Sequence, residues 1–142
     1  MLKKIPPILS PELMHVMMSM GHGDELVIAD ANFPAVTNAK RLVRADGHNI
    51  PTLLRAIMQF MPLDRYSDKP AALMSVVPGD PTEPTIWAKY QDILNRAEKK
   101  EVAIEMVERF AFYDRAREAF AVVATSEKAL YANIILKKGV IG

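Results

Sequence analysis

The sequence predicts an α/β fold with three layers, in which helices cover both faces of a mainly parallel sheet in a Rossmann-like topology. Segments with helical periodicity alternate with short apolar segments along most of the chain. Segment 71–77 is almost continuously apolar, which is typical of strands covered on both faces. The length of 142 residues suits one domain, predicted to span residues 1–142.

Capping residues and apolar patterning predict the elements in the first third of the chain. A helix begins after Ser10, whose hydroxyl can cap it, with Pro11 at the first helical position. It ends at Gly21, a residue typical of helix C-termini. An apolar strand is predicted at 25–29, and a weaker strand candidate lies at 41–44.

Amphipathic periodicity defines the elements that follow. A helix over 51–61 places its apolar residues on one face and ends before Pro62. After the strand at 71–77, the clearest amphipathic helix of the chain covers 86–97. The last part is predicted to hold a strand at 102–107, a helix at 112–119, and strands at 120–124 and 134–136. Arg115 and Arg117 are expected on a solvated helix face.

Composition and charge exclude several classes of function. The formal net charge is +1, so nucleic acid is not favoured as a partner. The absence of cysteine removes disulfides, thiolate metal sites and cysteine nucleophiles, and is compatible with a cytoplasmic location. No apolar run approaches the roughly 18 residues of a membrane span, and no signal peptide is recognisable, so no membrane partner is expected.

Motifs for metals and cofactors are missing as well. The spacing of His15, His22 and His48 matches no common zinc signature. The chain has neither a Walker-type loop nor a serine nucleophile elbow. We therefore expect no metal and no cofactor.

The first candidate for chemistry is His22, which stands between Gly21 and Gly23. An imidazole suits proton transfer near neutral pH, and glycine allows the backbone unusual angles. The local sequence taken alone favours a plain exposed loop histidine. Asp30 directly follows a predicted strand, where ligands of open α/β sheets gather, although Asp also caps turns often.

Two further candidates lie in the second half. Arg109 follows a predicted strand, and its fork of donors can hold sugar hydroxyls or a carboxylate. Phe110, Phe112 and Tyr113 could pack on the apolar face of a sugar ring, although aromatic residues more often belong to the core. The segment 131–133 offers a phenol and an amide just before the last strand, a pattern of little specificity by itself.

Taken together, these sites resemble the L-fucose mutarotase and D-ribose pyranase family. The resemblance covers nearly the whole chain. It is carried by Ser10–Leu13, Met20–Glu25, Asp30–Pro34, Arg44–Gly47, Arg109–Tyr113 and Asn133–Val140, with Gly-His-Gly-Asp and the closing Leu-Lys-Lys-Gly as its most specific parts. Arg109–Tyr113 is closer to the fucose branch than to the ribose branch.

The resemblance implies a role for each candidate residue. His22 corresponds to the general acid of the family, and the substrate contacts correspond to Asp30, Arg109, Tyr113, Tyr131, Ala132 and Asn133. The fucose enzymes usually have Gly where this chain has Ala132. The implied substrate is a free monosaccharide such as L-fucose, whose anomers interconvert when the anomeric hydroxyl loses a proton and the ring oxygen gains one. Tyr131 or Tyr113 is the candidate for the second proton carrier.

The predicted positions of His22 and Asp30 raise a geometric question. They flank the strand at 25–29, and a strand rises about 3.3 Å per residue, so roughly 16 Å separate them. A single subunit can use both only if the glycine loop folds back. The alternative is a site shared between subunits, and the resemblance implies ring-like homo-oligomers, often decamers, with pockets at subunit contacts.

Other functions remain open from the sequence. The chain could be a non-catalytic monosaccharide-binding protein on the same fold, or a D-ribose pyranase-type isomerase. A nucleotide-binding regulatory domain is a weaker interpretation, because no phosphate-binding loop is present.

Overall fold

The computed structural model describes residues 1–142 and contains a single six-stranded sheet. Its strands are β1 (Glu25–Ala29), β2 (Leu42–Ala45), β3 (Ala71–Met74), β4 (Ile104–Val107), β5 (Ala121–Thr125) and β6 (Ile134–Lys137). The order across the sheet is β2-β5-β1-β6-β3-β4. The strand β6 is antiparallel to both neighbours, β1 and β3, whereas every other pairing is parallel. The prediction of an α/β fold with a mainly parallel sheet is confirmed.

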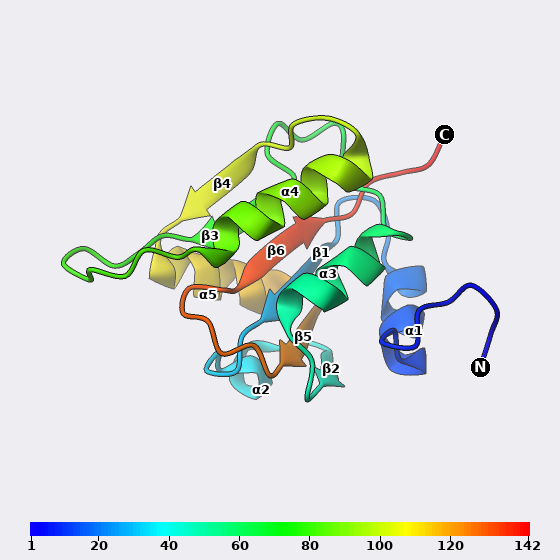
Figure 1. The fold of residues 1–142 in the computed structure, drawn as a ribbon, viewed down its shortest axis with the longest axis horizontal. Coiled ribbons are helices and arrows are strands. Elements are labelled where there is room, and N and C mark those ends of the chain that lie inside the picture. The colour runs from blue at the N-terminus through cyan, green and yellow to red at the C-terminus, as the bar shows by residue number, and fades with distance from the viewer.

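Five helices cover the two faces of this sheet. They are α1 (Pro11–Ser19), α2 (Ala35–Asn38), α3 (Ile50–Met58), α4 (Ile86–Glu98) and α5 (Arg109–Glu118). Apolar side chains of α1, α3 and α4 join the hydrophobic cluster on one face, and those of α2 and α5 join the cluster on the other. Figure 1 shows α3 and α4 crossing in front of the strands and α5 behind them. The predicted three layers are therefore present.

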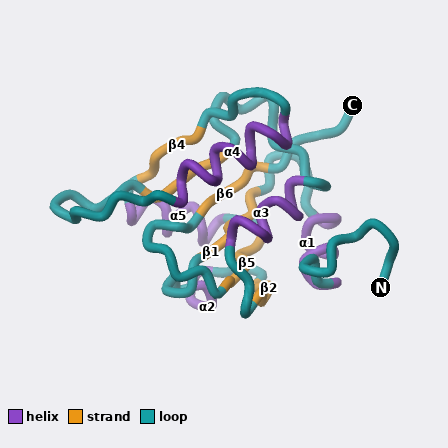
Figure 2. Tube along the Cα trace, in the orientation of Figure 1, coloured by secondary structure: helices purple, strands orange, loops and turns teal.

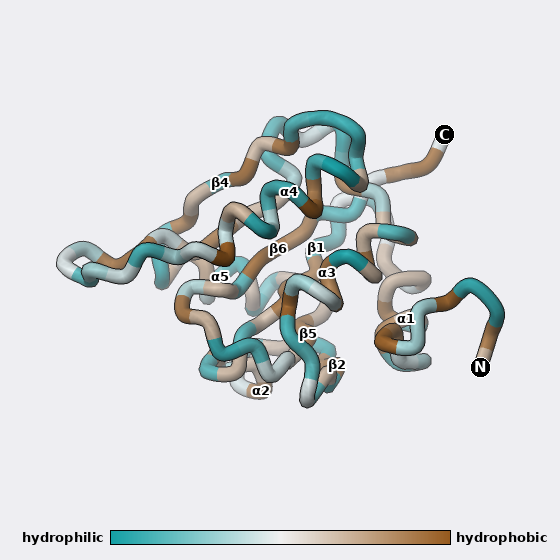
Figure 3. Tube along the Cα trace, in the orientation of Figure 1, coloured by the Kyte–Doolittle hydropathy of each residue, from teal (hydrophilic) through white to brown (hydrophobic).

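The central strand β6 illustrates why the strands read as apolar runs. Ile134 and Leu136 enter the core under α3 and α4, while Ile135 enters the core under α5, and all three side chains are fully buried. Because successive side chains of a strand point to opposite faces, a sheet covered on both faces needs apolar residues at every position. Figure 3 shows the contrast between the hydrophobic β6 and the amphipathic α4.

Several boundaries differ from the predicted ones for local reasons. Helix α5 begins at Arg109 rather than at residue 112, because the Glu108 carboxylate accepts hydrogen bonds from the N–H groups of Phe110 and Ala111. The short helix α2 was not predicted, since its four residues are too few for a periodic pattern. The strand β3 ends at Met74 rather than at residue 77.

The environment of Arg115 also differs from the prediction. Its guanidinium lies 2.6 Å from Glu25 Oε2 and 2.8 Å from Glu105 Oε2. Its side chain is only 27% exposed, so it ties α5 to the sheet rather than lying on a solvated helix face. Phe112 is fully buried as expected of an aromatic core residue, whereas Phe110 is 61% exposed.

The loops at the two ends of the sheet have different characters. The long loop 75–85 between β3 and α4 projects from the molecule and is the extended teal tube at the left of Figure 2. The chain termini lie at the other end (Figure 1).

None of the helices combines the length and the apolarity required to cross a bilayer.

Candidate active site

Most of the predicted ligand-binding side chains converge at one edge of the sheet. The carboxyl ends of β1 and β3 meet the amino end of β6 there, because β6 runs antiparallel to both. A cavity of about 240 Å³ opens at this edge. It is lined by Asp30, Asn32, Phe33, Met74, Val77, Asp80, Arg109, Tyr113, Leu130, Tyr131 and Asn133. The combination of an apolar wall with a few converging polar groups is typical of small-molecule sites.

Larger surface hollows exist elsewhere, but each of them contains at most one of the predicted site residues. A groove of about 640 Å³ beside α1 is lined mainly by methionine and other apolar side chains. A hollow of about 600 Å³ around Arg115 is lined only by polar and charged residues. We therefore place the candidate active site at the smaller cavity, where five polar residues face six hydrophobic ones.

Asp30 directly follows the carboxyl end of β1 and lines the cavity. Its carboxylate accepts a hydrogen bond of 3.0 Å from the N–H of Asn32, and the residue is only 7% exposed. Burial raises the pKa of Asp30 above its usual value, although hydrogen bonds from the backbone of Asn32, Ala132 and Phe33 oppose this effect. Asp30 is thus a fixed, desolvated acceptor that suits a sugar hydroxyl.

The segment 131–133 is held in an unusual conformation next to Asp30. Tyr131 has φ = 55°, in the left-handed region that a non-glycine residue rarely adopts. Two side chains of α4 secure it: Trp87 donates to the Tyr131 carbonyl at 2.8 Å, and the Tyr90 hydroxyl donates to the Ala132 carbonyl at 2.7 Å. The turn directs the Tyr131 side chain into the cavity wall.

Of the other two residues of this segment, Asn133 lines the cavity and Ala132 does not. The side-chain oxygen of Asn133 accepts the N–H of Asp30 at 2.7 Å, which leaves the Asn133 NH₂ group as the donor for a ligand. Ala132 is fully buried and does not line the cavity. Because the Ala132 backbone is already bonded to Asp30 and Tyr90, a contact between Ala132 and a sugar stays a prediction.

Asp80 belongs to the cavity but was not predicted as a site residue. It reaches the cavity from the projecting loop, and its Oδ2 accepts a hydrogen bond of 2.5 Å from the Tyr131 hydroxyl. Hydrogen bonds from Thr82 and Tyr131 lower the pKa of Asp80, and the same contact raises the pKa of Tyr131. The pair is therefore a neutral phenol beside an ionised carboxylate.

Arg109, the first residue of α5, supplies the positive charge of the cavity. Its guanidinium carbon lies 4.6 Å from the centre of the Phe110 ring, and no carboxylate pairs with it. Its Nε is buried without a hydrogen-bond partner. Because a buried unpaired donor is costly, this guanidinium is ready to receive a ligand oxygen. The tilted rings of Phe33 and Tyr113, 5.6 Å apart, form part of the apolar wall.

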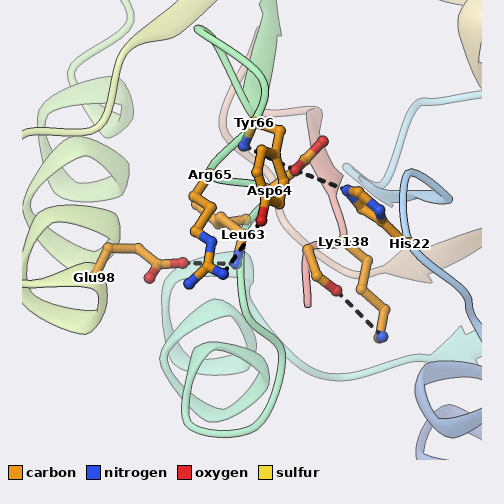
Figure 4. Close-up of polar contacts among 8 residues, drawn as sticks. His22, Leu63, Asp64, Arg65, Tyr66, Glu98 and Lys138 are labelled. Carbon is orange, nitrogen blue, oxygen red and sulfur yellow. Dashed lines mark hydrogen bonds and ion pairs between the residues drawn. The ribbon is translucent and has the colours of Figure 1, made fainter. Parts of the chain in front are cut away.

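His22 lies at the opposite end of the sheet from this cavity. It precedes β1, whereas Asp30 follows β1, and the neighbouring Gly23 N–H bonds to the carbonyl of Lys138, just beyond β6. The His22 Nε2 lies 3.0 Å from Asp64 Oδ1, and its ring packs at 5.7 Å against that of Tyr66 (Figure 4). The glycine loop therefore does not fold back to bring His22 to Asp30.

The structure thus assembles two groups of predicted residues. One contains Asp30, Arg109, Tyr113, Tyr131 and Asn133 around a cavity; the other is His22 alone. Sequence reasoning missed Asp64 and Asp80, which lie in irregular segments whose only signal is an Asp preceding a turn. No three side chains of His, Cys, Asp or Glu converge anywhere in the structure as a metal site would require.

Comparisons with known proteins agree with this architecture. A model of the RbsD / FucU transport protein family matches residues 3–141. The fucose mutarotase of Homo sapiens is 49% identical over 146 residues, which cover 99% of this chain and 94% of that protein. The L-fucose mutarotase of Actinobacillus pleuropneumoniae serotype 5b is 49% identical over 140 residues, covering 99% of this chain and 97% of that protein.

A solved structure matches the whole fold. The crystal structure of the fucose mutarotase from Streptococcus pneumoniae, in complex with L-fucose, superposes with a TM-score of 0.95. It is 48% identical in sequence, and the match covers 99% of this chain and all of that one. The complete architecture described above is therefore shared with a protein that binds a monosaccharide.

Proposed function

The chain belongs to the RbsD / FucU family, and from this premise we propose that it is a mutarotase that interconverts the α and β anomers of free L-fucose. The single observation that carries the proposal is the cavity at the edge of the sheet. Its carboxylate, amide, phenol and unpaired guanidinium face an apolar wall, which matches a ligand with hydroxyls on one side and carbon on the other.

The polar groups of the cavity divide into acceptors and donors. The Asp30 carboxylate can accept from sugar hydroxyls, while Arg109 and the NH₂ group of Asn133 can donate to sugar oxygens. The apolar side chains of Met74 and Leu130 suit the methyl carbon of a 6-deoxy sugar. This division supports L-fucose over an aldose with a hydroxyl at every carbon.

Mutarotation requires one group that takes the anomeric proton and another that protonates the ring oxygen. Tyr131 is the better candidate for the first role, because its proton already points at a carboxylate, Asp80, that can receive it. As Tyr131 takes the anomeric proton, its own proton moves to Asp80, and no tyrosinate accumulates. Tyr113 contacts the rings of Phe33 and Phe110 instead, which supports a binding role.

We propose His22 for the second role, protonation of the ring oxygen. The ring oxygen takes a proton from the His22 imidazolium, the ring opens, and closure on the other carbonyl face returns both protons. The acid, His22, is hydrogen-bonded to the Asp64 carboxylate. The proton that the base, Tyr131, gives up is received by the Asp80 carboxylate. Positioned acid–base catalysis of this kind contributes about 10²–10⁴-fold.

The proposal includes self-association, because His22 and the cavity lie at opposite ends of β1. A second copy of the chain must then bring its His22 to the cavity of the first. The exposed side chains of Phe110 and Leu130 beside the cavity, and of Tyr66 beside His22, support contacts at both places. The specific assembly that we propose is a decamer with sites at its subunit contacts.

A cytoplasmic location belongs to the same proposal, and a chain without cysteine is compatible with a reducing compartment. Immunodetection in fractionated cells tests it: recovery from a membrane or an oxidising compartment contradicts the proposed location.

Saturation-transfer NMR on the free sugars tests the activity directly. Irradiation of one anomeric proton of L-fucose should reduce the signal of the other anomer when the protein is added. D-Ribose and related aldoses, measured in parallel, report preference, and new furanose exchange peaks would indicate pyranase activity. Line broadening without exchange would identify a sugar-binding protein instead.

A further inference from the structure

The loops that carry His22 and Asp64 are 42 residues apart in sequence and meet at the end of β6. In one loop, Gly23 donates its N–H to the carbonyl of Lys138 at 2.8 Å, and Lys138 donates back to the carbonyl of Asp24 at 2.8 Å. In the other loop, Asp64 donates its N–H to the carbonyl of Lys137 at 3.0 Å. The two consecutive residues Lys137 and Lys138 therefore hold the loops of both His22 and Asp64 in place.

The contact with Asp64 defines which edge of the His22 ring faces the protein. Its Nε2 lies 3.0 Å from Asp64 Oδ1, and its Nδ1 has no partner within the chain (Figure 4). The Asp64 side chain is 8% exposed and that of His22 is 45% exposed, so the ring leads from a buried carboxylate to the surface. The hydrogen bond from His22 holds the pKa of the Asp64 carboxyl below its usual value, so Asp64 is ionised at neutral pH.

Asp64 itself has little freedom to move. The same Oδ1 accepts the N–H of Tyr66 at 3.0 Å, and the preceding residue, Leu63, donates its N–H to Glu98 Oε1 at 2.6 Å. On the other side, a Cβ added to Gly139 would lie 2.3 Å from the Leu63 carbonyl oxygen, so only glycine allows this approach. The carboxylate is thus held by one backbone N–H, and the chain that carries it is fixed by the Glu98 hydrogen bond and by the close approach of Gly139, as a group that orients another side chain requires.

We infer that Asp64 is a positioning residue that fixes the hydrogen on Nε2 of His22 and thereby presents Nδ1 as the nitrogen that exchanges protons with the sugar. This inference deepens the proposed function and rests on it. An ionised carboxylate can only accept hydrogen bonds, so Nε2 must carry a hydrogen in both the neutral and the protonated imidazole. The proton that reaches the ring oxygen therefore leaves from Nδ1, on the ring edge turned away from Asp64.

The tautomer of His22 can be measured without any sugar. Long-range ¹H–¹⁵N correlation spectra of ¹⁵N-histidine-labelled protein, recorded where the imidazole is neutral, distinguish a hydrogen on Nε2 from one on Nδ1. The variant H22Q assigns the signals, since the chain has only two other histidines, His15 and His48. We expect neutral His22 of the wild-type protein to be the Nε2–H tautomer. In D64N we expect a mixture of the Nε2–H and Nδ1–H tautomers. A wild-type Nδ1–H tautomer, or one unchanged in D64N, overturns the inference.

The kinetic consequence is measured in the anomer-exchange assay. We expect D64N to lower kcat about 10- to 100-fold, within the range of general acid–base catalysis, with KM changed by less than about twofold. The matched control is D68N, which removes an exposed carboxylate from the same loop and should leave kcat unchanged. If D64N loses activity only together with its cooperative unfolding transition, or raises KM alone, Asp64 is structural and the inference is wrong.

These results also separate this inference from the proposed function. Wild-type protein that shows the expected tautomer but exchanges no anomers would contradict the mutarotase proposal, and with it the catalytic meaning of the tautomer. Wild-type protein that exchanges anomers at full rate while D64N does so equally fast would contradict only the role of Asp64.

Discussion

The hydroxyl of Tyr131 donates to the carboxylate of Asp80 at 2.5 Å and joins a turn with an unusual backbone conformation to the projecting loop 75–85. Asp80 is in turn oriented by the hydroxyl of Thr82 at 2.6 Å. The two residues are 51 positions apart, and neither lies in a helix or strand. Only the packing of α4 against the turn, through Trp87 and Tyr90, places the phenol where Asp80 can reach it.

The Tyr131–Asp80 pair predicts the behaviour of D80N. An amide can still accept the phenol hydrogen bond, but it cannot receive the proton. We expect kcat for anomer exchange to fall about 10- to 100-fold, as for loss of one general base, with a smaller change in KM. The matched control D92N, which removes an exposed carboxylate paired with Arg96, should retain the wild-type rate. Combining D80N with Y131F should add little to either single effect, because both interrupt one proton path.

The unpaired guanidinium predicts a specific effect of R109K. Lysine keeps the charge but loses the planar fork of donors and the contact with Phe110. We expect KM for L-fucose to rise about tenfold or more, since one charged hydrogen bond is worth about 1.5–3 kcal/mol. The control R96K changes an exposed arginine on α4 and should have no effect. A wild-type KM for R109K would remove Arg109 from the proposed sugar contacts.

The buried carboxylate of Asp30 predicts a pH-dependent stability. Its pKa is raised in the folded chain, mainly by burial, so its contribution to stability is present at low pH and is lost as the pH rises through the folded pKa. The variant D30N has no ionisable group at this position, so it does not lose stability in this way as the pH rises. The free energy of unfolding of D30N minus that of wild type, from urea titrations, should therefore increase between about pH 4 and pH 7, above the unfolded Asp value. A difference that stays constant or decreases contradicts this account of Asp30.

The close approach at Gly139 predicts a destabilised G139A. The added Cβ would lie 2.3 Å from the backbone oxygen of Leu63, so the loop that carries Asp64 must shift. Overpacking of this kind costs about 1–3 kcal/mol of unfolding free energy. At Gly21 the nearest atom to an added Cβ is a side-chain oxygen at 3.6 Å, so G21A is the matched control and should be close to neutral. Equal urea midpoints for the two variants would mean that the Gly139 contact is not restrictive.

The separation of His22 from the cavity predicts complementation between inactive variants. In a shared site, H22A supplies an intact cavity and R109A supplies an intact His22. We expect co-expressed H22A and R109A to recover about a quarter of the wild-type exchange rate, the statistical share of intact contacts in a mixed ring. Each variant expressed alone serves as the control. No recovery, or a fully active monomer in sedimentation, would be inconsistent with a shared site.

Local patterns were sufficient for elements whose signals lie within a few residues. The Ser10-Pro11 start of α1, the apolar face of α4 and the continuous apolar run of β3 all depend on short-range spacing, and each element was predicted close to its position. The α/β class follows from their alternation. The start of α5 was missed because the Glu108 carboxylate caps its own following residues, a role for which Glu is not a typical signal.

Periodicity and a resemblance over nearly the whole chain were enough to predict the layered α/β fold and five of the eleven residues that line the cavity. The tertiary structure was needed to identify Asp80 as the partner of Tyr131 and Asp64 as the partner of His22. It was also needed to place β6, antiparallel, between β1 and β3. The two kinds of interaction differ in the sequence separation of the residues that they join. Helix and strand signals act between neighbours in sequence, whereas these hydrogen bonds and strand pairings join segments dozens of residues apart, which meet only when the sheet forms.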